Sequence, residues 1–130
     1  MTATTLPALV QRFFTERLCT QLAASPNTIA SYRDTFRLLL QFATERTGNP
    51  PTKLSLEQID VNLVGDFLTH VEDKRGNSAR TRNARLAAIR SFFKFVAMSE
   101  PAHLLHCQKI LAMPGKRHVF WVQASYIRAR

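Results

Sequence analysis

The chain is 130 residues long and 45% hydrophobic, a length that suits one domain able to bury roughly two-thirds of its unfolded surface. Its 18 lysines and arginines against nine acidic residues give a net charge of +9, which favours a polyanionic partner, either nucleic acid or an anionic membrane. No apolar run reaches the roughly 18 residues of a spanning helix, and the N-terminus lacks the pattern of a signal peptide. Cys19 and Cys107 have no disulfide framework around them, so we expect a reduced, cytoplasmic protein.

In the first half of the chain, apolar residues recur with helical spacing and strand patterns are almost absent. The first helix is expected from about Leu6 to Gln21. Ser25 and Pro26 form a helix start, since Ser caps a helix and Pro fits its first turn. The helix that follows is expected to reach about Arg46, and apolar residues on both sides predict that its second half is buried all round.

The second half of the chain continues the helical pattern. A short helix is expected after Ser55, and a longer one over about 62–74. Ser78 is the next cap, for a helix of residues 78–98, and a final helix of about ten residues starts near Pro101 and stops at Pro114 and Gly115. The sequence therefore predicts an all-α fold, a compact bundle of five or six helices.

The helix expected at 78–98 concentrates positive charge, because residues 77–97 contain five cations and no acid. Projected at about 100° per residue, its apolar residues share one arc, and these are Leu86, Ile89, Phe92, Phe93, Val96 and Ala97. The adjoining arc is cationic or polar except at Ala87, and its members are Arg80, Asn83, Ala87, Arg90 and Lys94. Arg82 and Arg85 point near the apolar arc, but in the first two turns, where we expect them to leave the edge of the core.

Two interpretations of this cationic arc stand side by side. Ser78 and Thr81 add hydroxyl groups, Ala87 leaves a low point, and the helix N-terminus adds free N–H groups, all of which suit a DNA groove. A run of Lys and Arg is otherwise often a solvated helix face. Like charges three or four residues apart destabilise a helix by about a few tenths of a kcal/mol each. The lack of any compensating acid therefore favours a phosphate partner.

Three segments carry a resemblance to a known family: "SPNTIASYRDTFRLLLQFA" at 25–43, "LSLEQIDVNLVGDFLTHV" at 54–71 and "NSARTRNARLAAIRSFFKFVA" at 77–97. In this order they resemble the N-terminal core-binding, SAM-like domain of tyrosine recombinases and phage integrases. The resemblance covers about residues 5–115. It rests on Thr28-x-x-x-Tyr32, on the "L-x-x-I" helix start, and on Ser78 and Thr81 before "L-x-x-I-R-x-F-F-x-F".

The resemblance implies a helical domain that forms half of a C-shaped clamp around duplex DNA, with its second and fourth long helices facing the DNA. On the former helix the candidate contacts are Asn27, Thr28, Arg33 and Arg37, while Tyr32 is assigned to the core. On the latter they are Ser78, Arg80, Thr81, Arg82, Asn83, Arg85, Arg90 and Lys94. "MPGKR" at 113–117 resembles the start of a linker, which implies phosphate contacts for Lys116 and Arg117. We accordingly expect a DNA-binding domain over 1–112 and a linker start with an atypical tail over 113–130.

The chain departs from the family where the family's chemistry lies. The catalytic residues of the family are an Arg-rich pocket, a His-x-x-Arg motif and a nucleophilic Tyr, and none of the four histidines here has Arg at the third following position. Tyr126 has too few residues around it to build the cationic site that a phenol nucleophile needs. We therefore expect no catalysis. The tail from His118 is open to three explanations: a frameshift or premature stop, a truncated gene, or a docking helix.

One further cluster bears on cofactors. His103, His106 and Cys107 share a helix face, but a structural zinc site wants four ligands and no nearby pair supplies the rest, so we expect no metal and no cofactor. The first functional hypothesis is a DNA-binding module of a recombinase, with double-stranded DNA as its partner and no membrane or small-molecule substrate. The alternatives are a module that binds other recombinase protomers and a helical transcriptional regulator.

Overall fold

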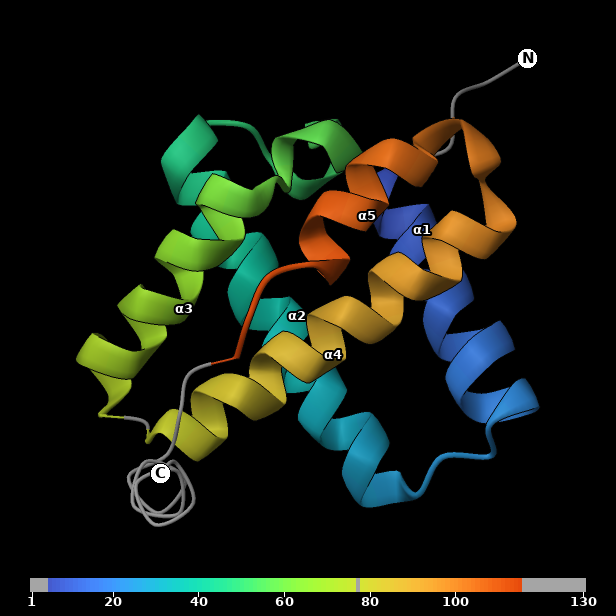
Figure 1. Cartoon of the computed structure of the whole chain (residues 1–130), viewed down its shortest axis with the longest axis horizontal. Coiled ribbons are helices and arrows are strands. Elements are labelled where there is room, and N and C mark those ends of the chain that lie inside the picture. Colours follow the sequence, from blue (N-terminus) through green and yellow to red (C-terminus); the bar gives the residue numbers. More distant parts are fainter. Residues whose placement is uncertain (1–4, 77, 116–130) are drawn as a thin grey trace, which may run out of the picture.

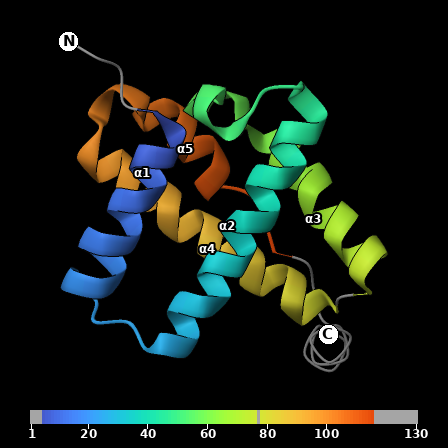
Figure 2. The same cartoon turned by 180° about the vertical axis from the view of Figure 1, so that it is seen from behind.

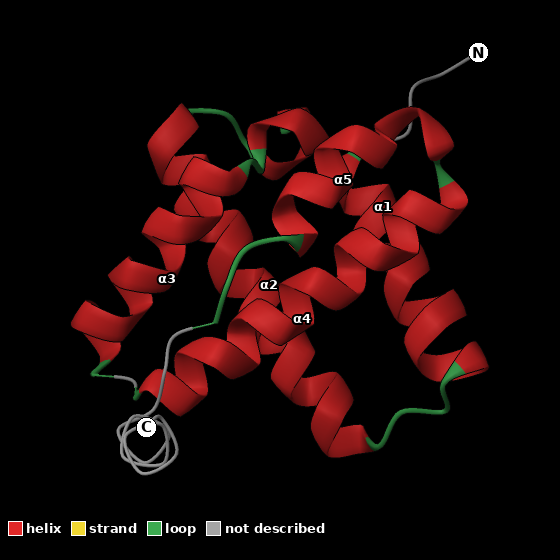
Figure 3. Cartoon of the chain, in the orientation of Figure 1, coloured by secondary structure: helices red, strands yellow, loops and turns green. Residues whose placement is uncertain are grey.

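The structure is a computed structural model that describes residues 5–76 and 78–115, and every regular element in these ranges is helical (Figure 3). The α-helices are α1 (Leu6–Arg12), α2 (Pro26–Thr47), α3 (Val61–Arg75), α4 (Ala79–Ser99) and α5 (Leu104–Leu111). Between them lie a π-helical segment (Phe13–Gln21) and the 3₁₀ turns Pro51–Lys53, Leu56–Gln58 and Pro101–His103. The predicted all-α fold is confirmed.

Side chains cap the helices where the sequence predicted helix starts. The Ser25 hydroxyl accepts a hydrogen bond from the Thr28 N–H at 3.1 Å. Ser78 does the same for Thr81 at the start of α4, at 3.2 Å. Each bond satisfies one of the N–H groups that an N-terminal helical turn leaves free. Gly76 ends α3 with φ of 63°, a left-handed conformation that favours glycine.

The first helix differs from its prediction in winding. It is helical up to Gln21, but from Phe13 onward its hydrogen bonds take the wider π register. The Thr20 hydroxyl donates to the Thr15 carbonyl, five residues earlier, at 2.8 Å. Phe13 is fully buried, and the centroid of its ring lies between 5.5 Å (Phe14) and 6.3 Å (Tyr32) from those of several other aromatic rings. Packing at this residue therefore accompanies the change of register.

The helices pack as a bundle in which α4 crosses in front of α2 and lies beside α5 (Figure 1), while the view from behind shows α1 and α2 in front (Figure 2). Helix α4 contacts α2, α3, α5 and the π-helical segment, so it is the central element of the fold. Phe36 and Phe92 join α2 to α4, with ring centroids 5.3 Å apart. Tyr32 is half-buried and stacks on Phe13, in agreement with its assignment to the core.

The second half of α2 is less buried than predicted. Leu39 and Ala43 are buried in the core, but Gln41 and Glu45 on the same helix are exposed. Leu38 and Phe42 are half-buried and line a hollow of about 330 Å³ between α2 and α3. One side of α2 therefore faces water along its whole length, and the prediction of burial all round was wrong.

Candidate nucleic-acid interface

Helix α4 divides into a buried side and an exposed cationic side, as its periodicity predicted. The whole apolar arc is buried except Ala97, which is half-buried. On the adjoining arc Arg80, Ala87 and Lys94 are exposed, and Asn83 and Arg90 are half-buried. We call these five residues the α4 cationic arc. It contains no acid, and neither does the rest of α4.

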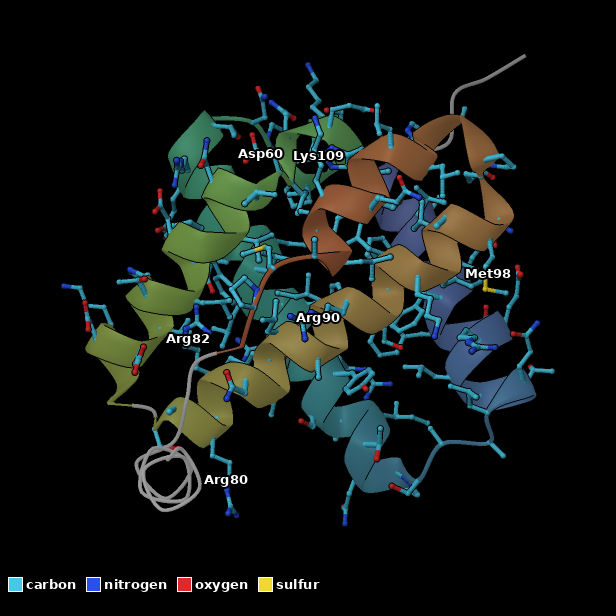
Figure 4. All side chains as sticks on the ribbon, in the orientation of Figure 1. Asp60, Arg80, Arg82, Arg90, Met98 and Lys109 are labelled. Atoms are coloured by element: carbon cyan, nitrogen blue, oxygen red, sulfur yellow. The ribbon has the colours of Figure 1, made fainter. Side chains whose placement is uncertain are left out.

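Three arginines of α4 point in different directions (Figure 4). Arg80 extends away from the body of the molecule, Arg82 lies toward α3, and Arg90 lies near the chain that follows α5. The Nε atom of Arg90 is buried and has no hydrogen-bond partner, although the side chain as a whole is half-buried. Within the α4 cationic arc, Arg80 and Lys94 therefore offer the most accessible charges.

The expectation that Arg85 leaves the edge of the core is corrected by the structure. Its side chain is only 11% exposed, and its Nη1 atom lies 3.3 Å from Asp34 Oδ2 and 3.4 Å from Thr35 Oγ1 of α2. The guanidinium turns inward because α2 supplies a carboxylate, and a buried charge needs such a partner. Arg85 thus joins α4 to α2.

Arg82 is also turned inward. Its side chain is 16% exposed, and its Nε lies 3.9 Å from Glu72 Oε1 of α3. The Nη1 atom of Arg82 is buried without a hydrogen-bond partner. The structure therefore places both arginines of the apolar edge between helices, and the expectation that they project outward was wrong.

The candidate residues of α2 lie in its first turns. Asn27 and Arg33 are exposed, and Thr28 is half-buried beside the cap, where its hydroxyl accepts a hydrogen bond from Ser25 at 3.1 Å. Arg37 is exposed, and its Nη2 lies 2.6 Å from Asp34 Oδ1. Figure 4 shows Arg80 at the same edge of the molecule at which α2 begins.

Asp34 accepts hydrogen bonds from arginines of both helices. Burial alone would raise the pKa of this carboxyl, but hydrogen bonds from Arg37 and Arg85 and their positive charges together lower it. The sequence did not identify Asp34 as a residue of the candidate interface. The signal that could have found it is Arg85 itself, because an arginine on the core side of a helix predicts an acid on the helix packed against it.

The chain after α5 turns back across the bundle. A Cβ atom placed on Gly65 of α3 would lie 4.0 Å from the Met113 side chain, and one on Gly115 would lie 3.3 Å from Asn83 Oδ1 of α4. The described chain thus ends beside the α4 cationic arc. Lys116 and Arg117 follow it directly and lie outside the described residues, as do Tyr126 and the tail 118–130.

The cluster considered for a metal makes other contacts. His103 Nδ1 lies 2.8 Å from Glu57 Oε2, and His106 Nε2 lies 3.0 Å from the Ile59 carbonyl oxygen. Cys107 is fully buried, and burial followed by the charge of Glu57 raises the pKa of its thiol to about 11. Over 5–76 and 78–115, no three His, Cys, Asp or Glu residues are grouped to hold a metal ion. The helices of these same ranges include none that is long and apolar enough to cross a membrane.

Comparison with known proteins matches residues 10–100 to the family described as "Phage integrase, N-terminal SAM-like domain". Two similar proteins come from Sinorhizobium fredii (strain NBRC 101917 / NGR234). One, named "Putative integrase/recombinase y4rC", is 49% identical over 112 residues, which cover 86% of this chain and 34% of that protein. The other, named "Putative integrase/recombinase y4rD", is 47% identical over 112 residues, which cover 86% of this chain and 40% of that protein.

A more distant similarity is to "Tyrosine recombinase XerC" of Caldanaerobacter subterraneus subsp. tengcongensis, which is 26% identical over 109 residues that cover 74% of this chain and 31% of that protein. The chain spans 34% and 40% of the length of its two Sinorhizobium relatives. No solved structure matches it significantly.

Proposed function

This chain belongs to the phage integrase family, matched over the N-terminal SAM-like domain, and we propose that it binds duplex DNA for site-specific recombination. The observation that carries the proposal is the α4 cationic arc, an exposed row of positive charge on a helix without any acid. Side-chain cations that neutralise phosphates release condensed counterions, and this is a major source of affinity for DNA.

The length of the arc suits a duplex. Arg80 and Lys94 are 14 positions apart, which corresponds to about 21 Å along a helix at 1.5 Å per residue. The major groove is about 12 Å wide, so the two cations can reach phosphates on both sides of it. Ala87 lies between them and is exposed, which allows the helix backbone to approach the groove closely.

The first turns of α2 supply the second part of the proposed surface. Asn27 and Thr28 lie at the N-terminus of α2, where the helix dipole favours a phosphate. Arg33 and Arg37 are exposed about one and a half and two and a half turns beyond Thr28. In this proposal Arg82 and Arg85 do not contact DNA but hold α4 against α3 and α2 through their ion pairs. Ser78 and Thr81 offer hydroxyl groups at the start of α4.

Two finer parts of the proposal rest on the family resemblance. Residues 113–130 are taken as the start of a linker and a tail, with Lys116 and Arg117 as phosphate contacts. The 130-residue polypeptide is taken to bind DNA without cutting it, because no His-x-x-Arg motif occurs in its sequence. A covalent adduct between this polypeptide and a nicked duplex would contradict the second point.

A second candidate function is binding to other recombinase protomers. The observation in its favour is a pair of adjacent leucines, Leu104 and Leu105, whose side chains are exposed at the start of α5. Exposed apolar side chains that lie together often mark a protein interface. Analytical ultracentrifugation with a full-length recombinase would show whether Leu105→Ser weakens such an association.

DNA binding is tested by fluorescence anisotropy with a labelled duplex over a series of salt concentrations. About five to eight phosphate contacts give a log–log slope of affinity against salt between about −4 and −7. Replacing Arg80, Arg90 and Lys94 with Gln is expected to lower affinity and to reduce the slope by up to about 2.7 units if all three contact phosphates.

A matched control removes three cations elsewhere, by Arg17→Gln, Lys53→Gln and Lys109→Gln. Lys109 lies at the opposite edge of the molecule from Arg80 (Figure 4). Arg12 is avoided, because its guanidinium packs over the Phe95 ring and pairs with Glu16 and Glu100. Equal losses of affinity in the two triple variants would mean that net charge alone governs binding and would reject the proposed surface.

A further inference from the structure

The two helices of the proposed surface carry two carboxylates, both on α2. Glu45 lies near the far end of α2, so Asp34 is the carboxylate that lies among the proposed contacts. Its two oxygens serve different helices. Oδ1 accepts from Arg37 of the same helix, at 2.6 Å, and Oδ2 accepts from Arg85 of α4, at 3.3 Å. An acid therefore occupies a position among cations that are proposed to bind phosphates.

The two arginines differ in their freedom to leave Asp34. Arg85 is buried and also lies 3.4 Å from the Thr35 hydroxyl, so its position is fixed by the packing of α2 against α4. The Arg37 side chain is 63% exposed and sits three residues from its partner. Exposed pairs of this kind stabilise a protein little, and they exchange readily with other anions.

We infer that Asp34 competes with DNA phosphate for Arg37 and so limits how tightly the surface holds DNA of any sequence, an inference that rests on the proposed function. A carboxylate and a phosphate both accept paired hydrogen bonds from a guanidinium. A phosphate that takes the Arg37 Nη2 donor bonded to Asp34 must displace the carboxylate from it. Asp34 keeps its bond to Arg85 during the exchange, so its carboxylate is not left without a partner.

The competition has a consequence for specificity. Where no DNA phosphate lies within reach of Arg37, the carboxylate of Asp34 repels the DNA backbone. Where a phosphate does lie within reach, its bond to Arg37 offsets that repulsion. The acid thereby weakens misplaced complexes more than correctly placed ones, which is a known means of discriminating between partners.

The test compares four proteins in anisotropy titrations with a random-sequence duplex: the wild type, Asp34→Asn, Arg37→Gln and the double variant. Asp34→Asn keeps an oxygen that can accept from Arg85. It is expected to raise affinity by about 3- to 10-fold and to steepen the salt slope by up to about 0.9. In the Arg37→Gln background, the same substitution is expected to raise affinity less than in the wild type, because only the direct repulsion between Asp34 and the DNA backbone is then relieved. Asp73→Asn, which removes one charge from the exposed side of α3, measures the effect of net charge alone.

Three results separate the possibilities. If Asp34→Asn raises affinity no more than Asp73→Asn, or raises it equally with and without Arg37, the inference is overturned while the proposed function stands. If the wild type binds no duplex even at low salt, both are rejected.

Should Asp34→Asn fold poorly by circular dichroism, a comparison of Arg37→Gln with Arg33→Gln still decides. Arg37 must give up its bond to Asp34 to bind a phosphate, so the inference requires Arg37→Gln to lower affinity less than Arg33→Gln does. Arg33 makes no ion pair with any residue of the described ranges.

Discussion

Arg85 of α4 donates a hydrogen bond to Asp34 of α2, with 3.3 Å between Nη1 and Oδ2. The bond crosses the interface between the two helices that form the proposed DNA surface, so it fixes how they lie relative to each other. Thr35 of α2 is buried beside it, and its hydroxyl donates to the Ser31 carbonyl at 3.2 Å while lying 3.4 Å from Arg85. Asp34 and Thr35 of α2 thus both lie within hydrogen-bond distance of the Arg85 Nη1 atom.

The stability of the fold is expected to depend unequally on the two partners. Asp34→Ala leaves a buried guanidinium without its carboxylate, and we expect it to lower the free energy of unfolding by about 1–3 kcal/mol. Arg85→Met removes the buried charge and leaves Asp34 able to bind water, so we expect a smaller loss. Urea unfolding followed by circular dichroism measures both. A larger loss for Arg85→Met than for Asp34→Ala would contradict this account.

The lowered pKa of Asp34 predicts how stability responds to acid. The folded state binds the proton of this carboxyl more weakly than the unfolded state, whose pKa is about 3.9. The stabilisation is therefore complete above the unfolded pKa and is lost as pH falls through the folded value. The difference in stability between the wild type and Asp34→Asn should be constant above about pH 5 and shrink below about pH 4. Thermal unfolding from pH 6 to pH 3 tests this, and a difference that stays constant to pH 3 would count against it.

Features that depend on local periodicity were predictable from the sequence. The exposed and buried sides of α4 follow from the spacing of its own residues, and the starts of α2 and α4 follow from the capping serines Ser25 and Ser78. The family was predictable for a related reason, because its motifs lie on these same helices.

Features that depend on which helix packs against which were not predictable. A helical projection placed Arg85 at the edge of the core but could not show that Asp34 lies opposite. Phe95 falls outside the apolar arc of α4, yet it is buried, because Arg12 packs over its ring and Phe13 contacts it. The π register after Phe13 is equally a matter of tertiary packing, since the sequence "FFTERLCTQ" contains no proline or glycine to change the winding.

The cap of α4 allows stability and DNA affinity to be separated at one residue. Ser78→Ala removes the acceptor for the Thr81 N–H, and we expect a loss of about 1 kcal/mol in the free energy of unfolding. Its effect on DNA affinity should be small at temperatures well below the unfolding midpoint. Ser78→Asp keeps a cap and adds a negative charge that the helix dipole favours, so stability should be equal to or above that of the wild type.

The same aspartate would face the phosphates if α4 binds DNA as proposed. Ser78→Asp is therefore expected to lower DNA affinity by about 5-fold or more at low salt and to reduce the salt slope, although the protein is at least as stable. Thermal unfolding and anisotropy on the same samples measure the two effects. As a control, Asp60 already caps α3 with a carboxylate, at the edge of the molecule away from Arg80 (Figure 4), and Asp60→Ser should leave DNA affinity almost unchanged. If Ser78→Asp retains the affinity of Ser78→Ala, the N-terminus of α4 does not lie against DNA.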